Sequence, residues 1–75
     1  MFITAKSALI DAGACKRWMP FECTVEYRRT LDTPWIPDAK GHSTDYLAEV
    51  YTDLRNLFCS ARIVNSETGQ ELFRG

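Results

Sequence analysis

The stretch STDYLAEVYTDLRNLF, residues 43–58, decides the fold. Its apolar residues recur every three or four positions, a spacing that gathers side chains on one face of an α-helix; they are Leu47, Val50, Tyr51, Leu54, Leu57 and Phe58. Ser43 or Thr44 can cap the first amides, and Asp45 and Arg55 suit the two ends of the helix dipole. We therefore predict an amphipathic helix whose apolar stripe must pack on another element.

The chain after this helix predicts a β-hairpin. Successive side chains of CSARIV, residues 59–64, alternate with the period of two that a strand requires. NSETGQ, residues 65–70, is typical of a hairpin loop in which Gly69 takes a positive φ angle. QELFRG, residues 70–75, then returns as a short final strand.

A third strand is predicted before the helix. In FECTVEYRRTL, residues 21–31, Cys23, Val25 and Tyr27 fall on one side and polar residues fall on the other. The segment that joins this strand to the helix, residues 32–42, is expected to be a long loop.

The N-terminal part predicts a short helix. Thr4 can cap a helix that runs through SALIDAG, residues 7–13, and Gly13 can end it. Residues 14–20 are expected to form a turn or a second short helical segment. Pro20 then forces an extended backbone before the strand.

These elements predict one α+β domain over residues 1–75, with a three-stranded sheet covered on one face by the 43–58 helix. A right-handed strand–helix–strand connection would place the first strand parallel to one hairpin strand. The N-terminal segment is the one part left to cover the other face. If it does not do so, that face is open for binding.

The near-equal numbers of basic and acidic side chains argue against nucleic acid as a partner. Nine basic and ten acidic side chains give a formal charge of −1, whereas nucleic-acid binding draws on a basic excess. No apolar run approaches the roughly 20 residues that span a bilayer, and the N-terminus does not resemble a signal peptide. We therefore expect a soluble, cytoplasmic protein with no membrane contact.

The three cysteines, Cys15, Cys23 and Cys59, are odd in number, far apart and without a C-x-x-C pair, so they fit neither a disulfide framework nor a zinc site. Each falls in a predicted core or strand position. We interpret them as buried thiols in a reducing compartment.

The motif GHSTD, residues 41–45, holds the only histidine, and it is best explained as the start of a helix. A Cys–His enzyme would need a thiol beside His42, and a metal site would need paired ligands around it. Bound phosphate would meet the negative charge of Asp45 in the first turn. We predict no catalytic residue, no metal and no cofactor.

Aromatic and basic residues are the best candidates for binding a partner. Trp35 and Ile36 lie in a proline-stiffened segment, and tryptophan and arginine are enriched among residues that dominate interface energy. The candidate partner-binding residues are Trp35, Ile36, Arg28, Arg29 and Trp18. Two interpretations of Trp35 remain open: a lid folded over the end of the sheet, or an exposed anchor.

The order of elements resembles a known layout. FECTVEYRR, a loop, STDYLAEVYTDLRNLF and then CSARIVN-SETG-QELFRG, residues 21–75, are similar to the β-α-β-β layout of several small phage-encoded inhibitors. Among them are an inhibitor of bacterial RNA polymerase and some anti-CRISPR proteins. The resemblance rests on element order and implies a stoichiometric blocker of a host protein.

We therefore expect a non-enzymatic protein-interaction module. Its partner would be a protein of unknown identity, and the exposed edge of the final strand could also pair two copies into a homodimer. A small nucleic-acid-binding accessory protein is the first alternative. A small enzyme, or a subunit of one, is the second.

Overall fold

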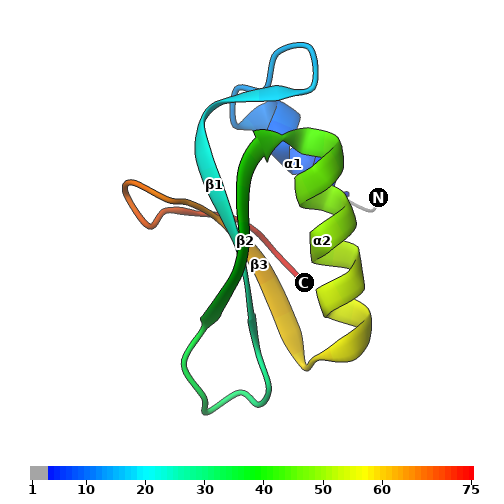
Figure 1. Cartoon of the computed structure of the whole chain (residues 1–75), viewed down its shortest axis with the longest axis vertical. Helices are drawn as coiled ribbons and strands as arrows, with labels where there is room; N and C mark the ends of the chain where they lie inside the picture. Colours follow the sequence, from blue (N-terminus) through cyan, green and yellow to red (C-terminus); the bar gives the residue numbers. More distant parts are fainter. Residues whose placement is uncertain (1–3) are drawn as a thin grey trace.

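The computed structural model describes residues 4–75, which form two helices and four strands. The elements are α1 (Ala5–Asp11), β1 (Trp18–Arg28), β2 (Ile36–Ser43), α2 (Thr44–Leu57), β3 (Ser60–Asn65) and β4 (Glu71–Arg74). The strands form one antiparallel sheet in the order β2-β1-β3-β4. Both helices lie on the same side of this sheet (Figure 1), so the predicted α+β class is confirmed. No helix of the described part is long and apolar enough to cross a membrane.

The sheet has four strands where the sequence predicted three. The additional strand, β2, occupies most of the segment that was expected to be a loop. Its sequence, IPDAKGHS, contains proline, aspartate and glycine, which are depleted in strands. It still pairs with β1 because it is an edge strand, where proline is tolerated. A bulge also leaves Asp38 out of the register between Pro37 and Ala39.

The predicted parallel pairing is wrong for the same reason. β2 runs antiparallel to β1, and α2 then carries the chain across to the other side of β1. There β3 also runs antiparallel to β1. Tyr27 of β1 accordingly lies opposite Ile36 of β2 and Ala61 of β3. The missed strand therefore changed the topology as well as the strand count.

Helix α2 follows the sequence prediction closely. Ser43 is its N-cap and accepts a hydrogen bond from the amide of Tyr46 at 3.3 Å. Leu47, Tyr51 and Leu54 are buried against the sheet. Leu57 is 74% exposed, because it lies about 80° around the helix from the line of Leu47, Tyr51 and Leu54. Its assignment to the apolar stripe was wrong.

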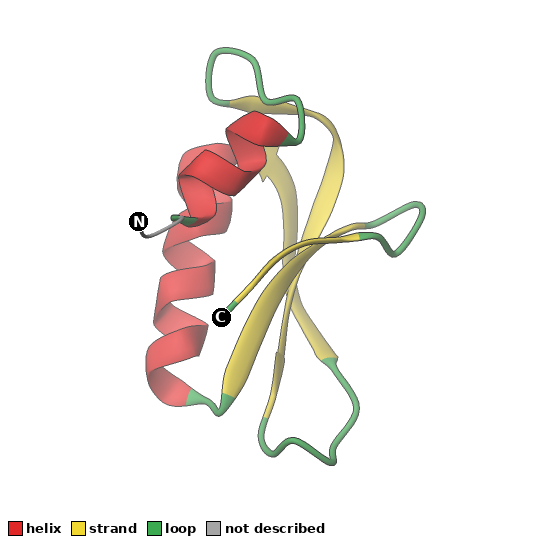
Figure 2. Cartoon of the chain, turned by 180° about the vertical axis from the view of Figure 1, so that it is seen from behind, coloured by secondary structure: helices red, strands yellow, loops and turns green. Residues whose placement is uncertain are grey.

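The N-terminal helix also forms where predicted, directly after its cap Thr4. Thr4 caps α1 by accepting a hydrogen bond from the amide of Ser7 at 3.1 Å, and Gly13 has a φ of 113° just beyond its end. The fully buried Leu9 fixes α1 in the core, and α1 packs on α2 and β4. Figure 2 shows both helices on one side, so the N-terminal segment does not cover the second face of the sheet.

Strand β1 begins at Trp18, three residues before the predicted start. Residues 15–18 form a tight two-residue turn, closed by hydrogen bonds of 2.9 and 3.0 Å between the backbones of Cys15 and Trp18. Only Cys23 of the three cysteines is buried, which corrects the expectation for the other two. Cys15 and Cys59 precede β1 and β3, outside the alternation that buries strand residues.

Candidate functional site

The face of the sheet that points away from the helices is the candidate site, and we call it the open face. Val25 is fully buried towards the helices, and the ring of Tyr27 stacks on Phe58 with centroids 4.2 Å apart. Side chains alternate along a strand, so Glu26 and Arg28 point to the other side. In β3 the same alternation places Arg62, between the buried Ala61 and Ile63, on the open face.

Trp35 lies on this face between two basic side chains in sequence-distant strands. The guanidinium carbons of Arg28 (β1) and Arg62 (β3) each lie 4.4 Å from the centroid of its ring. Such cation–π contacts contribute about 0.5–2 kcal/mol each, depending on how far the pair is desolvated. The ring is half-buried, so Trp35 packs on the open face and still presents part of its surface to solvent.

An ionic network holds Arg62 in place. Its Nε donates to Oε1 of Glu26 at 2.8 Å, and its Nη1 donates to Oε2 of Glu71 at 3.3 Å. Arg74 joins the same network through Glu71 at 3.2 Å. The network crosses β1, β3 and β4, so it fixes the guanidinium on which Trp35 rests.

Arg28 has a different environment. Its Nε is buried and makes no hydrogen bond within residues 4–75, and its guanidinium forms no ion pair among them. Its guanidinium lies instead over the face of Trp35. A buried donor without an acceptor costs about 1–3 kcal/mol, which the contact with the indole partly offsets.

A shallow groove of about 270 Å³ also lies on the open face, and Arg62 is part of its lining. Its lining includes Glu26 and Arg62 at one end and Lys40 of β2 at the other. Thr24 forms part of the floor, with its hydroxyl 2.6 Å from that of Ser66. The groove presents polar and apolar surface in nearly equal parts, and the exposed Lys40 has no ion pair within the described residues.

The structure brings together two of the five residues singled out in the sequence. Arg28 and Trp35 are in contact, whereas Arg29 is exposed in the loop after β1. Ile36 is half-exposed opposite Tyr27. Trp18 is exposed at the far end of β1, so it does not join the Trp35 cluster.

Trp18 instead pairs with the single histidine. Its ring stacks on His42 with centroids 5.5 Å apart and an interplanar angle of 8°. Ser43, next to His42, is the cap of α2, as the interpretation of GHSTD as a helix start requires. Within residues 4–75 no three His, Cys, Asp or Glu residues gather as a metal ion would need.

Sequence reasoning missed Arg62, which links Glu26 to Trp35. The alternation of residues 59–64 already placed Arg62 opposite the core-facing side chains. The missing information was the register between β1 and β3, which sets Glu26 directly opposite Arg62. That register depends on long-range pairing that a local pattern does not contain.

Comparison of this chain with protein-family models, with curated proteins and with solved structures found no match. Its function is therefore inferred from its own residues and their geometry.

The three cysteines predict a clear difference in thiol reactivity. Burial and the nearby charge of Glu22 raise the pKa of Cys23 to about 11, while Cys15 and Cys59 are exposed. At pH 8 we expect a thiol reagent such as DTNB to modify two cysteines rapidly and the third only after denaturation. A third thiol that reacts in the native protein as fast as the first two would contradict the packing around Cys23.

The same pKa predicts the sign of a pH effect on stability. The folded protein holds the thiol proton more tightly than the unfolded chain, so the contribution of Cys23 is present below about pH 9 and lost as pH rises towards 11. Cys23→Val should remove this part of the alkaline loss of stability.

Proposed function

We propose that this chain is a non-enzymatic protein-interaction module that covers a surface of a partner protein with the open face of its sheet. Trp35, held between the guanidinium groups of Arg28 and Arg62, is the observation that carries the proposal. The groove towards Lys40 extends the surface, whereas Ile36 lies opposite Tyr27 and therefore shares its side of the sheet. The proposal assigns no catalytic step to the chain.

The physical support is the preorganisation of the cluster. Trp35 sits between Pro34 and Pro37, which restrict the backbone, and two arginines restrict its ring. A side chain that is already ordered loses less conformational entropy when a partner docks. Tryptophan and arginine are also the residue types that most often dominate interface energy.

We further propose that the chain is an inhibitor encoded by a phage or another mobile element and that it acts in the cytoplasm. The first part is supported by the resemblance of its element order to small phage inhibitors. Strand β2 is an addition to the β-α-β-β layout on which that resemblance rests. Cys15, Cys23 and Cys59 form no disulfide, which supports the proposed location in a reducing compartment.

The test is an affinity pull-down from a lysate of the host cell with mass spectrometry, comparing wild type with Trp35→Ala. We expect the alanine variant to bind the captured partner at least about tenfold more weakly, because removing an interface tryptophan commonly costs more than 1.4 kcal/mol. Thermal melting must first show that the variant is folded.

Leu57→Ala is the matched control for this experiment. Leu57 is a large exposed apolar side chain on α2, on the other side of the sheet. Its replacement should leave partner capture unchanged. A partner that is retained by Trp35→Ala and lost by Leu57→Ala would place the interface on the helical side and refute the proposal.

Nucleic-acid binding is a second candidate because three basic side chains, Arg28, Arg29 and Lys40, form no ion pair within residues 4–75. Such free cations are suited to phosphate contacts, although the formal charge of −1 opposes them. Retention on heparin with a steep salt dependence would favour this function. Passage through heparin at low salt would eliminate it.

A second copy of the chain is a further candidate partner. Strand β4 is an edge of the sheet, so its outer backbone groups are available to another strand. The opposite edge, β2, carries Pro37, a bulge at Asp38 and the charged Lys40, all of which discourage pairing. Homodimerisation is therefore proposed through β4.

A further inference from the structure

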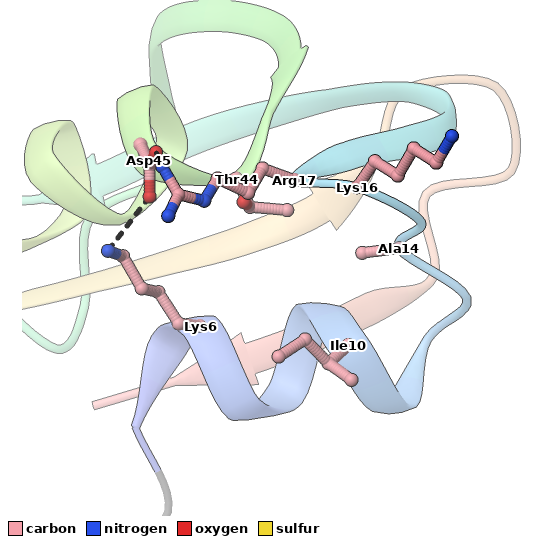
Figure 3. A pocket seen from close by; sticks show the side chains of 7 residues that line it. All are labelled: Lys6, Ile10, Ala14, Lys16, Arg17, Thr44 and Asp45. Carbon is pink, nitrogen blue, oxygen red and sulfur yellow. Dashed lines mark ion pairs between the residues drawn. The ribbon is translucent and has the colours of Figure 1, made fainter.

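A cavity of about 510 Å³ lies where α1, the 15–18 turn and the start of α2 meet (Figure 3). Its lining residues come from all three segments: Lys6, Ile10, Ala14, Lys16, Arg17, Thr44 and Asp45. Three of them are basic and one is acidic. The cavity therefore carries an excess of positive charge in a chain whose overall formal charge is −1.

The single carboxylate of the cavity is already paired. Oδ1 of Asp45 lies 2.8 Å from Nζ of Lys6, and Oδ2 lies 3.6 Å from Nη1 of Arg17. The hydrogen bond from Lys6, together with the two positive charges, lowers the pKa of Asp45, so this carboxylate stays ionised. Its one negative charge leaves a formal excess of two positive charges. The expected repulsion of an anion by Asp45 is thus balanced by the neighbouring cations.

Thr44 is the first residue of α2, and its side chain lines the cavity although the residue is only 4% exposed. Among residues 4–75 the buried side-chain polar atom without a hydrogen-bond partner is Nε of Arg28, so the hydroxyl of Thr44 keeps access to the cavity and can donate into it. An anionic oxygen in the cavity would accept this hydrogen bond at the positive end of the α2 dipole.

Lys16 and Arg17 occupy a turn whose backbone conformation is unfavourable for both residues. Both residues have left-handed backbones, with φ of 50° and 64°, where Asn-Gly is the usual pair. The carbonyl of Arg17 accepts a hydrogen bond from the amide of Thr44 at 3.0 Å, which ties the turn to the start of α2. Two basic side chains are therefore held at the rim of the cavity at the cost of local strain.

We propose that this cavity binds a phosphate monoester, with its phosphate group at Lys6, Arg17 and the hydroxyl of Thr44, while the side chain of Lys16 extends away from them and adds positive charge at the rim (Figure 3). The cavity is larger than a phosphate ion, and Ile10 and Ala14 give it an apolar wall for the organic part of the ligand. Charge-assisted hydrogen bonds to phosphate oxygens are the interactions that these basic groups make best. The site shares no lining residue with the groove of the open face, so its test is independent of the test of the proposed protein-binding function.

The test is an NMR titration of the ¹⁵N-labelled protein with phenyl phosphate, with sodium chloride of equal ionic strength as the reference. We expect saturable shifts of the amides of Lys16, Arg17, Thr44 and Asp45 with phenyl phosphate alone. Inorganic phosphate should bind more weakly because it does not reach the apolar wall. Equal shifts with sodium chloride, or no saturation with phenyl phosphate, would overturn the proposal.

The decisive variant is Lys16→Asn combined with Arg17→Gly. It removes two cations and installs the pair that this turn prefers, so its melting temperature should rise while its affinity for phenyl phosphate falls at least about tenfold. Because the variant is expected to be more stable, loss of binding is not a consequence of unfolding. Lys40→Asn, which removes an exposed cation from the open face, is the matched control and should bind normally. Unchanged binding by the double variant would overturn the site.

Comparing the affinities of inorganic phosphate and phenyl phosphate separates the phosphate-binding groups from the apolar wall as sources of binding. Tighter binding of the ester supports the role of Ile10 and Ala14. Equal binding of both would overturn that role and reduce the site to one for phosphate alone.

Discussion

Leu47→Ala is expected to lower the free energy of unfolding by about 2–5 kcal/mol, the range measured for leucines truncated in close-packed cores. Leu47 is fully buried in the core, in the first turn of α2. A domain of this size has about 4–11 kcal/mol of stability in total, so the change removes a large share of it. Urea denaturation followed by circular dichroism measures the loss.

Leu57→Ala is the internal control, since it makes the same chemical change in the same helix at a position that is 74% exposed. Its effect should stay within about 0.5 kcal/mol. Equal losses in the two variants would show that α2 does not bury the face assigned to it.

Arg62→Met is expected to lower the free energy of unfolding by about 1.5–3 kcal/mol, because it removes charged hydrogen bonds from a partly buried site. The side chains of Arg62 and Glu26 are only 23% and 17% exposed, and their contact is 2.8 Å. Without Arg62, the carboxylate of Glu26 loses its closest positive partner in a poorly solvated position. Thermal and urea unfolding give the size of the effect.

Two comparisons separate this mechanism from a general loss of packing. Glu26→Gln combined with Arg62→Met should be less destabilised than the sum of the two single changes, because neither partner is left as an unpaired charge. Arg74→Met removes a pair whose arginine is 49% exposed, so its effect should be below about 1 kcal/mol. Equal losses for Arg62→Met and Arg74→Met would contradict the central position of Arg62.

The helices and the final hairpin could be predicted because their signals are local. Ser43 and Thr4 cap the helices as expected, and Gly69 takes a φ of 77° in the hairpin loop. The core stripe of α2 follows from spacing alone. Leu57 was misassigned because apolar residues spaced three or four positions apart include some that lie at the margin of the buried stripe.

Strand β2 could not be predicted from its composition. Pro37, Asp38 and Gly41 are residues of loops unless the strand lies at an edge and contains a bulge, and only the tertiary structure supplies both conditions. The missing strand had a further consequence. Without it, the antiparallel return of β3 and the contact between Arg62 and Glu26 could not be inferred.

The candidate sites were predicted only in part. The sequence singled out Trp35 and Arg28, but neither their contact nor the role of Arg62 follows from spacing. The cavity beside α1 was also missed, because its lining residues come from separate segments of the chain that meet only after folding. The left-handed backbones of Lys16 and Arg17 had no sequence signal at all.

Site-specific photo-cross-linking tests the central claim, binding through the open face, most directly. A photoreactive benzoylphenylalanine replaces either Lys40, exposed on the open face, or Glu49, exposed on α2. Irradiation in host cells should yield a covalent adduct with one defined protein from position 40 and none from position 49. Adducts from position 49 alone, or equal adducts from both positions, would contradict the assignment of the open face as the binding surface.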